Sequence, residues 1–230
     1  MQVIVDESLG LPNEVLEEAV IRKAKLKNDS SLPEMVQKHK GGVIAKKLTV
    51  AKRNKESELE EMIQLLEQYE EILYVYDSFM LDEGLLKRIR TWAYPKRKLF
   101  LLNGAENRAF TIYFLEKLKE MLFEELYYSN HHPTKKFTIT NDPKYQSGYL
   151  LLKKFKHKQF HVFDSRRQTK IVSGRKQDLL EQFVHLPSAE IYIASRKPIF
   201  PDHRSVKYFE LQKHSLPVCS DWTDIFIPQY

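Results

Sequence analysis

The residues of this sequence best suited to phosphate chemistry lie in one stretch, Lys153 to Lys176. Within it His157 and Asp164 stand seven residues apart, and the pair Ser173-Gly174 follows. A histidine can act as a nucleophile or a general acid, and a carboxylate can support it. Because lysines and arginines surround these residues, the pattern predicts a site for a phosphate group or another anion.

Positive charge is distributed unevenly along the chain. Residues 1–69 carry 11 Lys and Arg against 12 Asp and Glu, whereas residues 70–230 carry 26 against 19, so the two parts have net charges of −1 and +7. Between His132 and Lys176 there are 12 basic residues and two acids, Asp142 and Asp164. An anionic partner is expected there, and the alternative is a solvated lysine-rich surface.

Length and composition indicate a globular protein with one main domain. The chain has 230 residues, of which 42% are hydrophobic and 30% charged, and it contains no run of about 18 apolar residues. The first ten residues lack the basic and apolar regions of a secretory signal. Cys219 is the single cysteine and has no partner for an internal disulfide, so a cytoplasmic location is expected.

The order of expected elements predicts an α/β fold with a mixed sheet flanked by helices. Residues 72–77 and 98–104 are expected as parallel strands around a helix at 82–92, and a long amphipathic helix is expected at 106–128. Further strands are expected at 135–140, 149–152, 159–164, 170–172, 190–194 and 206–211, with a helix at 178–186. Residues 1–69 are expected to form an α-rich segment, either a partner-docking arm or a part of the sheet, with a short strand at 2–5 and helices beginning near residues 12, 33 and 54. The predicted domains are therefore 1–69 and 70–230.

The His157 motif resembles that of the phospholipase D superfamily. In that superfamily a histidine is followed by a lysine two positions later and by an aspartate five positions after the lysine, and a glycine-serine pair helps to bind phosphate. Here Gln159 stands at the lysine position, and the pair is reversed in Ser173-Gly174. The strand-helix-strand order before the motif is also similar, and the phospholipase D-like C-terminal domain of MIT-domain proteins is the most similar member. The resemblance implies a single phospholipase D-like unit in residues 70–230, in which the missing lysine favours phosphate binding over cleavage.

The predicted function is the binding of a polyanion, with DNA or RNA as the favoured partner. His157 and Asp164 are the candidate catalytic residues of the resemblance, and a homodimer would supply a second His157. The residues expected to contact phosphate are Lys153, Lys154, Lys156, Lys158, Arg166, Arg167, Lys170, Ser173, Arg175 and Lys176.

Two other functions are compatible with the same residues. One is an active nuclease, acting either through His157 or through Mg²⁺ held by Asp6 and Asp77, which follow expected strands. The other is binding to an anionic membrane surface. Outside the metal-dependent alternative no cofactor is expected, and the sequence does not decide whether the protein is an enzyme.

Overall fold

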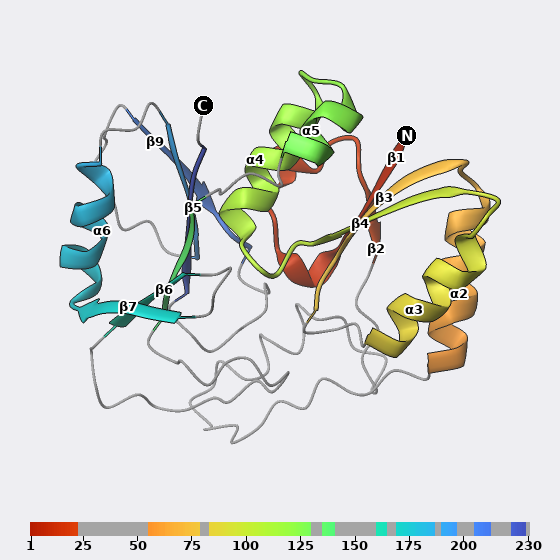
Figure 1. The fold of residues 1–230 in the computed structure, drawn as a ribbon, viewed down its shortest axis with the longest axis horizontal. Coiled ribbons are helices and arrows are strands. Elements are labelled where there is room, and N and C mark those ends of the chain that lie inside the picture. The colour runs from red at the N-terminus through yellow and green to blue at the C-terminus, as the bar shows by residue number, and fades with distance from the viewer. Residues whose placement is uncertain are drawn as a thin grey trace.

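The computed structural model describes residues 1–22, 55–78, 83–129, 135–140, 160–164, 169–186, 190–196, 205–212 and 222–228. Within these residues the chain forms two β-sheets that carry helices on their faces (Figure 1). The prediction of an α/β fold with mixed strands flanked by helices is confirmed at this level. None of the described helices is long and apolar enough to cross a lipid bilayer.

The first sheet is parallel and has the strand order β2-β1-β3-β4. Its strands are β1 (Gln2–Asp6), β2 (Val20–Arg22), β3 (Glu71–Tyr76) and β4 (Lys98–Asn103). Successive side chains of a strand point to opposite faces, so Leu73 and Val75 face one way while Ile72 and Tyr74 face the other. All four of these side chains are buried, as expected for a parallel sheet covered on both faces.

Two helices, α2 (Lys55–Glu67) and α3 (Glu83–Ala93), cover one face of this sheet. Met62 and Leu66 of α2 and Ile89 of α3 pack with Ile72 and Tyr74 in one buried cluster. The helix predicted to begin near residue 54 therefore contacts the sheet through the side of α2 that carries Met62 and Leu66.

The second sheet has the strand order β7-β6-β5-β10-β8-β9. Its strands are β5 (Lys135–Thr140), β6 (Phe160–Asp164), β7 (Thr169–Gly174), β8 (Ile191–Ser195), β9 (Val206–Glu210) and β10 (Thr223–Ile227). Neighbouring strands are antiparallel except for the parallel pair β8 and β9. Helix α6 (Lys176–Val184) covers one face through Leu179, Leu180 and Phe183.

Helix α4 (Arg108–Leu118) lies between the two sheets, and α5 (Phe123–Ser129) follows it (Figure 1). One buried cluster joins residues of the first sheet, of α4 and of the second sheet. Phe110 of α4, for example, meets Phe226 of β10 with ring centroids 5.1 Å apart. Because both sheets share this core, α4 fixes the position of one sheet against the other.

Two helix predictions are corrected by the structure. Residues 12–22 were expected to begin a helix, but they form the short 3₁₀ turn η2 (Asn13–Val15) and strand β2. The β-branched residues Val20 and Ile21 pair with β1, and this tertiary pairing outweighs the helical spacing of the apolar residues. The single helix expected at 106–128 is interrupted at residues 119–122, between α4 and α5.

Strands β1 and β3 pair although they come from either side of the predicted boundary at residues 69 and 70. Residues 1–22 thus contribute two strands to a sheet that residues 71–103 complete. The predicted strand at 149–152 lies outside the described residues.

Candidate functional site

The predicted phosphate-binding stretch is described only in part. His157 lies outside the described residues, as do Lys153, Lys154, Lys156, Lys158, Arg166 and Arg167. Asp164 ends β6 at the register position opposite Phe137 of β5 and Thr169 of β7. Lys170 is exposed on β7, the edge strand of the second sheet.

Ser173, expected to line a phosphate groove, has its hydroxyl 2.6 Å from Nδ1 of His161. The two residues lie opposite each other on β7 and β6. Burial lowers the pKa of His161, and the charge of Lys170 lowers it further. This histidine is therefore held in its neutral form more firmly than a solvated one.

Arg175 and Lys176 lie at the start of α6 rather than on a strand. Arg175 is the residue before the first helical turn, with extended backbone angles, and Lys176 is the first residue of the helix. The Lys176 ammonium lies 5.5 Å from the centroid of the Phe160 ring, which is within the range of a cation–π contact.

Asp6, proposed as a metal ligand of a nuclease, has its oxygens occupied by donors. Its carboxylate accepts hydrogen bonds from Arg22 at 3.0 Å, from the Tyr74 hydroxyl at 3.0 Å and from the Asp77 backbone N–H at 2.9 Å. Among the described residues no group of three or more histidine, cysteine or acidic side chains could hold a metal ion. Asp6 thus joins β1 to β2 and β3.

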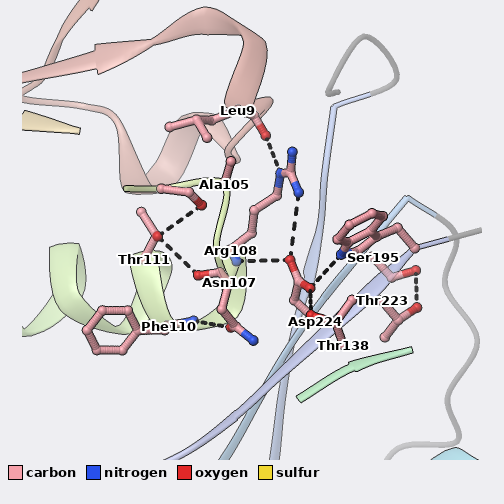
Figure 2. A network of polar contacts seen from close by, with 12 residues as sticks. Leu9, Ala105, Asn107, Arg108, Phe110, Thr111, Thr138, Ser195, Thr223 and Asp224 are labelled. Atoms are coloured by element: carbon pink, nitrogen blue, oxygen red, sulfur yellow. Dashed lines mark hydrogen bonds and ion pairs between the residues drawn. The ribbon is translucent and has the colours of Figure 1, made fainter. Parts of the chain in front are cut away.

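A buried polar network connects the two sheets at the start of α4 (Figure 2). The Arg108 side chain donates from Nε to the Leu9 carbonyl at 3.0 Å, and its Nη1 lies 3.7 Å from Oδ2 of Asp224 on β10. The Arg108 backbone N–H also donates to Oδ2 of Asp224, at 2.9 Å. Arg108 is therefore bonded both to the loop after β1 and to the second sheet.

The other oxygen of Asp224 accepts from two side chains of the second sheet. Thr138 Oγ1 donates to Oδ1 at 2.8 Å, and Trp222 Nε1 donates to the same atom at 2.6 Å. Asp224 is completely buried, and this burial raises its pKa against the opposing effects of Arg108, Thr138 and Trp222. The carboxylate thus depends on Arg108 and these donors to remain charged.

Asn107, the residue before α4, completes the connection. Its Oδ1 accepts from the Phe110 backbone N–H at 2.9 Å and caps the helix. Its Nδ2 donates to the carbonyls of Phe137 at 3.1 Å and Ile225 at 3.3 Å, which belong to β5 and β10. The start of α4 is therefore attached to the middle of the second sheet through two consecutive residues.

An apolar groove lies at the other end of α4, with a volume of about 270 Å³. We call it the apolar groove, and its lining residues are Met1, Val3, Val15, Glu18, Ala19, Leu115, Leu118, Lys119, Met121, Leu122 and Phe123. Met121 and Leu122 remain 42% and 72% exposed between α4 and α5. Lys119 provides an ammonium group, which lies 3.8 Å from the Glu17 carboxylate in an ion pair that both side chains leave exposed.

Neither the buried network nor the apolar groove was predicted. Arg108 follows Asn107 in the sequence, which is a usual helix start, but its partners Leu9 and Asp224 lie 99 and 116 residues away. The groove combines residues near the N-terminus with the end of α4, so no local spacing signals it. Met121 and Leu122 are expected on the buried side of the predicted helix, and only the structure shows that they are exposed.

Comparison with known proteins finds similarity at the level of fold. No protein-family profile and no curated protein sequence matches the chain. Among solved structures, a DegV family protein from Thermus thermophilus, described as binding fatty acids, superposes with a TM-score of 0.58 and 10% identity. The hypothetical protein TM841 from Thermotoga maritima, for which a fatty acid binding function is described, superposes with a TM-score of 0.56 and 9% identity. Each comparison covers 99% of this chain and 99% of the other.

These similarities correct the interpretation of the His157 motif. The fold matches the DegV family protein over both sheets, so the assignment to a phospholipase D-like unit is wrong. The predicted binding of DNA or RNA rested on the basic stretch as well as on that assignment, and the nuclease alternative rested on His157 or on Asp6 and Asp77. These predictions are corrected, because the structurally similar proteins are described as binding fatty acids. The spacing of His157, Asp164 and Ser173-Gly174 therefore does not identify a phospholipase D-like unit, and the chain has the fold of these two proteins, which are described as fatty acid binding.

Proposed function

We propose that this chain binds a fatty acid or a related amphiphile with one unbranched chain and an anionic head group. The observation that carries the proposal is the fold, which is shared from end to end with two proteins described as fatty acid binding. The described part of the chain offers a matching surface in the apolar groove. The proposed function is binding without a chemical reaction, because holding an amphiphile in the apolar groove requires no catalytic side chain.

The apolar groove suits a single acyl chain in size and lining. Its volume of about 270 Å³ lies just below the range of roughly 300 to 1,000 Å³ that is usual for small-molecule sites. Val3, Leu115 and Leu118 provide aliphatic walls. Each methylene that leaves water there would contribute about 0.8 kcal/mol.

Lys119 provides a side-chain ammonium to a carboxylate at this groove. Its ion pair with Glu17 joins side chains that are 40% and 71% exposed. Exposed pairs of this kind contribute about 0 to 1 kcal/mol, so a fatty acid carboxylate can compete with Glu17 for the ammonium. Head-group binding therefore requires no rearrangement of the fold.

Titration of delipidated protein with hexadecanoate tests the proposal. Isothermal titration calorimetry should give saturable binding of hexadecanoate and weaker binding of hexadecanol, which lacks the charge. Absence of saturable binding by the wild-type chain would overturn the proposed function.

Two pairs of variants test the place of binding. Leu118→Trp fills the apolar groove, and Leu186→Trp, which changes a 38% exposed leucine beyond α6, is its control. Lys119→Gln removes the ammonium, and Lys98→Gln, on β4, is its control. The first member of each pair should weaken hexadecanoate binding at least tenfold and its control should not, whereas equal binding by all four variants would place the acyl chain elsewhere.

A further inference from the structure

Ser173 and His161 place a hydroxyl and an imidazole in direct contact on the second sheet. Oγ of Ser173 lies 2.6 Å from Nδ1 of His161, and the two residues face each other across the pair of strands β6 and β7. Both side chains are partly buried. An imidazole in this position can take the hydroxyl proton while the oxygen attacks a substrate, which is how proteins activate serine as a nucleophile.

Strand β7 contains a β-bulge beside this pair. Phe163 of β6 pairs with Lys170 of β7, whereas Val162, the residue before Phe163, pairs with Val172. Ile171 is therefore an extra residue of β7 with no partner position on β6. Bulges of this kind often lie next to active sites, where they change the direction of a side chain.

The bulge places a cation on the same face of the sheet as the hydroxyl. In a regular strand, residues 170 and 173 would point to opposite faces, because side chains alternate. Here Lys170 lies opposite Phe163 and Ser173 lies opposite His161, and these two β6 residues share one face. Burial lowers the pKa of His161, and the charge of Lys170 lowers it further, so the ammonium acts on the imidazole.

A small molecule can reach these side chains from the edge of the sheet. Strand β7 is an edge strand, Ile171 is 56% exposed and Lys170 is exposed. Helix α6 covers the opposite face of this strand pair, where Val162 and Leu179 pack together (Figure 1). The face that carries Ser173 is therefore not the one beneath α6.

We propose that Ser173, His161 and Lys170 form a site that hydrolyses an ester of a carboxylic acid. Oγ of Ser173 forms a bond to the carbonyl carbon, and its proton moves to Nδ1 of His161. The carbonyl oxygen becomes negatively charged, and the Lys170 ammonium stabilises that charge. The bond from the carbonyl carbon to the alcohol oxygen then breaks, and the alcohol leaves with the proton from Nδ1.

A water molecule completes the reaction. It attacks the acyl group on Ser173 while His161 takes one of its protons, and the bond between Oγ and the acyl carbon breaks. The proton returns to Oγ, so the products are a carboxylic acid, an alcohol and the unchanged serine. This activity goes beyond the proposed binding function, because none of the three residues lines the apolar groove.

Hydrolysis of p-nitrophenyl acetate by the whole chain tests the activity. The assay is made at pH 8, where an unperturbed histidine is already neutral. The wild type should release nitrophenolate at least tenfold faster than buffer alone. A fluorophosphonate should also label the chain, because attack by Oγ breaks the phosphorus–fluorine bond and leaves a stable adduct, which peptide mass spectrometry should find on Ser173.

Two pairs of variants assign the reaction to the serine and the histidine. Ser173→Ala should abolish labelling and hydrolysis, whereas Thr169→Ala, on the same strand, should keep both. His161→Asn should slow hydrolysis by about a hundredfold to ten-thousandfold, the usual contribution of a general base, and His185→Asn should not.

A third pair tests the cation. Lys170→Gln should slow hydrolysis at least threefold and leave Ser173 able to react with the fluorophosphonate, while Lys135→Gln, exposed on β5, should react as the wild type does. A hydrogen bond that served only to hold β6 against β7 would give variants with altered melting temperatures and no labelling of the wild type.

The inference is overturned if the wild type releases nitrophenolate no faster than buffer, if the adduct forms on residues other than Ser173, or if Ser173→Ala and Thr169→Ala hydrolyse the ester equally. Labelling of the wild type does not depend on whether a variant folds. Hexadecanoate titration of Ser173→Ala separates the two proposals, because it should bind hexadecanoate as tightly as the wild type.

Discussion

Arg108 and Asp224 form an ion pair that water does not reach, with side-chain exposures of 1% and 0%. Burying two charges costs free energy, and their contact with each other and with fixed donors compensates for it. Arg108 is bonded to Leu9 as well as to Asp224, so it connects the two sheets. A substitution that removes only one of the two charges should therefore destabilise the fold more than one that removes both.

Arg108→Met should lower the free energy of unfolding by about 3 to 5 kcal/mol, because it leaves the Asp224 carboxylate buried without its counter-charge. The double variant Arg108→Met/Asp224→Asn should be more stable than Arg108→Met alone. In it the Asn oxygen can still accept from Thr138 and Trp222, and no buried charge remains. Urea unfolding of the wild type, the single variants and the double variant measures the coupling; additive effects would contradict it.

His161 makes the free energy of unfolding depend on pH. Burial, and then Lys170, lower its pKa in the folded state, so the unfolded chain binds the proton more readily. The stabilisation is fully present above the unfolded value of about 6.5 and is lost as the pH falls through the folded pKa. Urea unfolding at pH 7.5, 6.5 and 5.5 should show a smaller loss of stability at acidic pH for His161→Asn than for the wild type, with His185→Asn as the control. An identical pH dependence in wild type and His161→Asn would contradict this.

At the scale of elements, the turn from β4 into α4 requires a residue without a side chain. A Cβ added at Gly104 would lie 2.6 Å from Cδ1 of Leu9 and 2.9 Å from Cγ1 of Val75. Both neighbours are fully buried in the core that α4 shares with the sheets. Gly104 therefore permits the close approach of this turn to the end of β1.

Gly104→Ala should cost about 1 to 3 kcal/mol, the usual range for overpacking a core. Gly174→Ala is the matched control, because a Cβ there would meet Leu179 at an ordinary 3.5 Å. That change should be neutral or slightly stabilising, since alanine restricts the unfolded chain. Urea unfolding should give a lower midpoint for Gly104→Ala than for Gly174→Ala. Equal midpoints would show that Leu9 moves aside without a loss of folding free energy.

Elements with a strong local pattern could be predicted from the sequence. The short continuous apolar run of β3, rich in residues that favour strands, and the helical spacing of the apolar residues of α2 indicate these two elements. β2 could not be predicted, because Val20 and Ile21 become a strand only through pairing with β1. The candidate sites were missed for the same reason, since Arg108 meets Leu9 and Asp224, and Lys119 reaches the apolar groove, only after the chain has folded.

At the scale of the whole molecule, the two sheets share one hydrophobic core through α4. Tyr113 of α4 packs edge-on against Tyr192 of β8 at 5.2 Å between ring centroids, while the same cluster includes Leu73 and Val75 of β3. If either sheet separated from α4, apolar side chains of the shared core would be exposed on α4 and on both sheets. The sheets are therefore expected to unfold together.

The two tryptophans allow this to be measured, because Trp92 lies on α3 beside the first sheet and Trp222 precedes β10 in the second. Each of the variants Trp92→Phe and Trp222→Phe retains one fluorescent reporter. In each variant, urea unfolding followed by fluorescence should coincide with unfolding followed by circular dichroism, as a two-state transition requires. A fluorescence transition separated from the circular dichroism transition would indicate that the sheets unfold independently.

The position of β10 has a consequence for synthesis on the ribosome. It is the last described strand in the chain, yet it lies between β5 and β8 in the middle of the second sheet. Until Ile227 leaves the exit tunnel, β5 and β8 each have an edge that β10 does not yet pair with. Arg108 also lacks its ion-pair partner Asp224 until then. The nascent protein therefore carries open strand edges until β10 has emerged, which makes the period before β10 pairs the one when it most needs a chaperone.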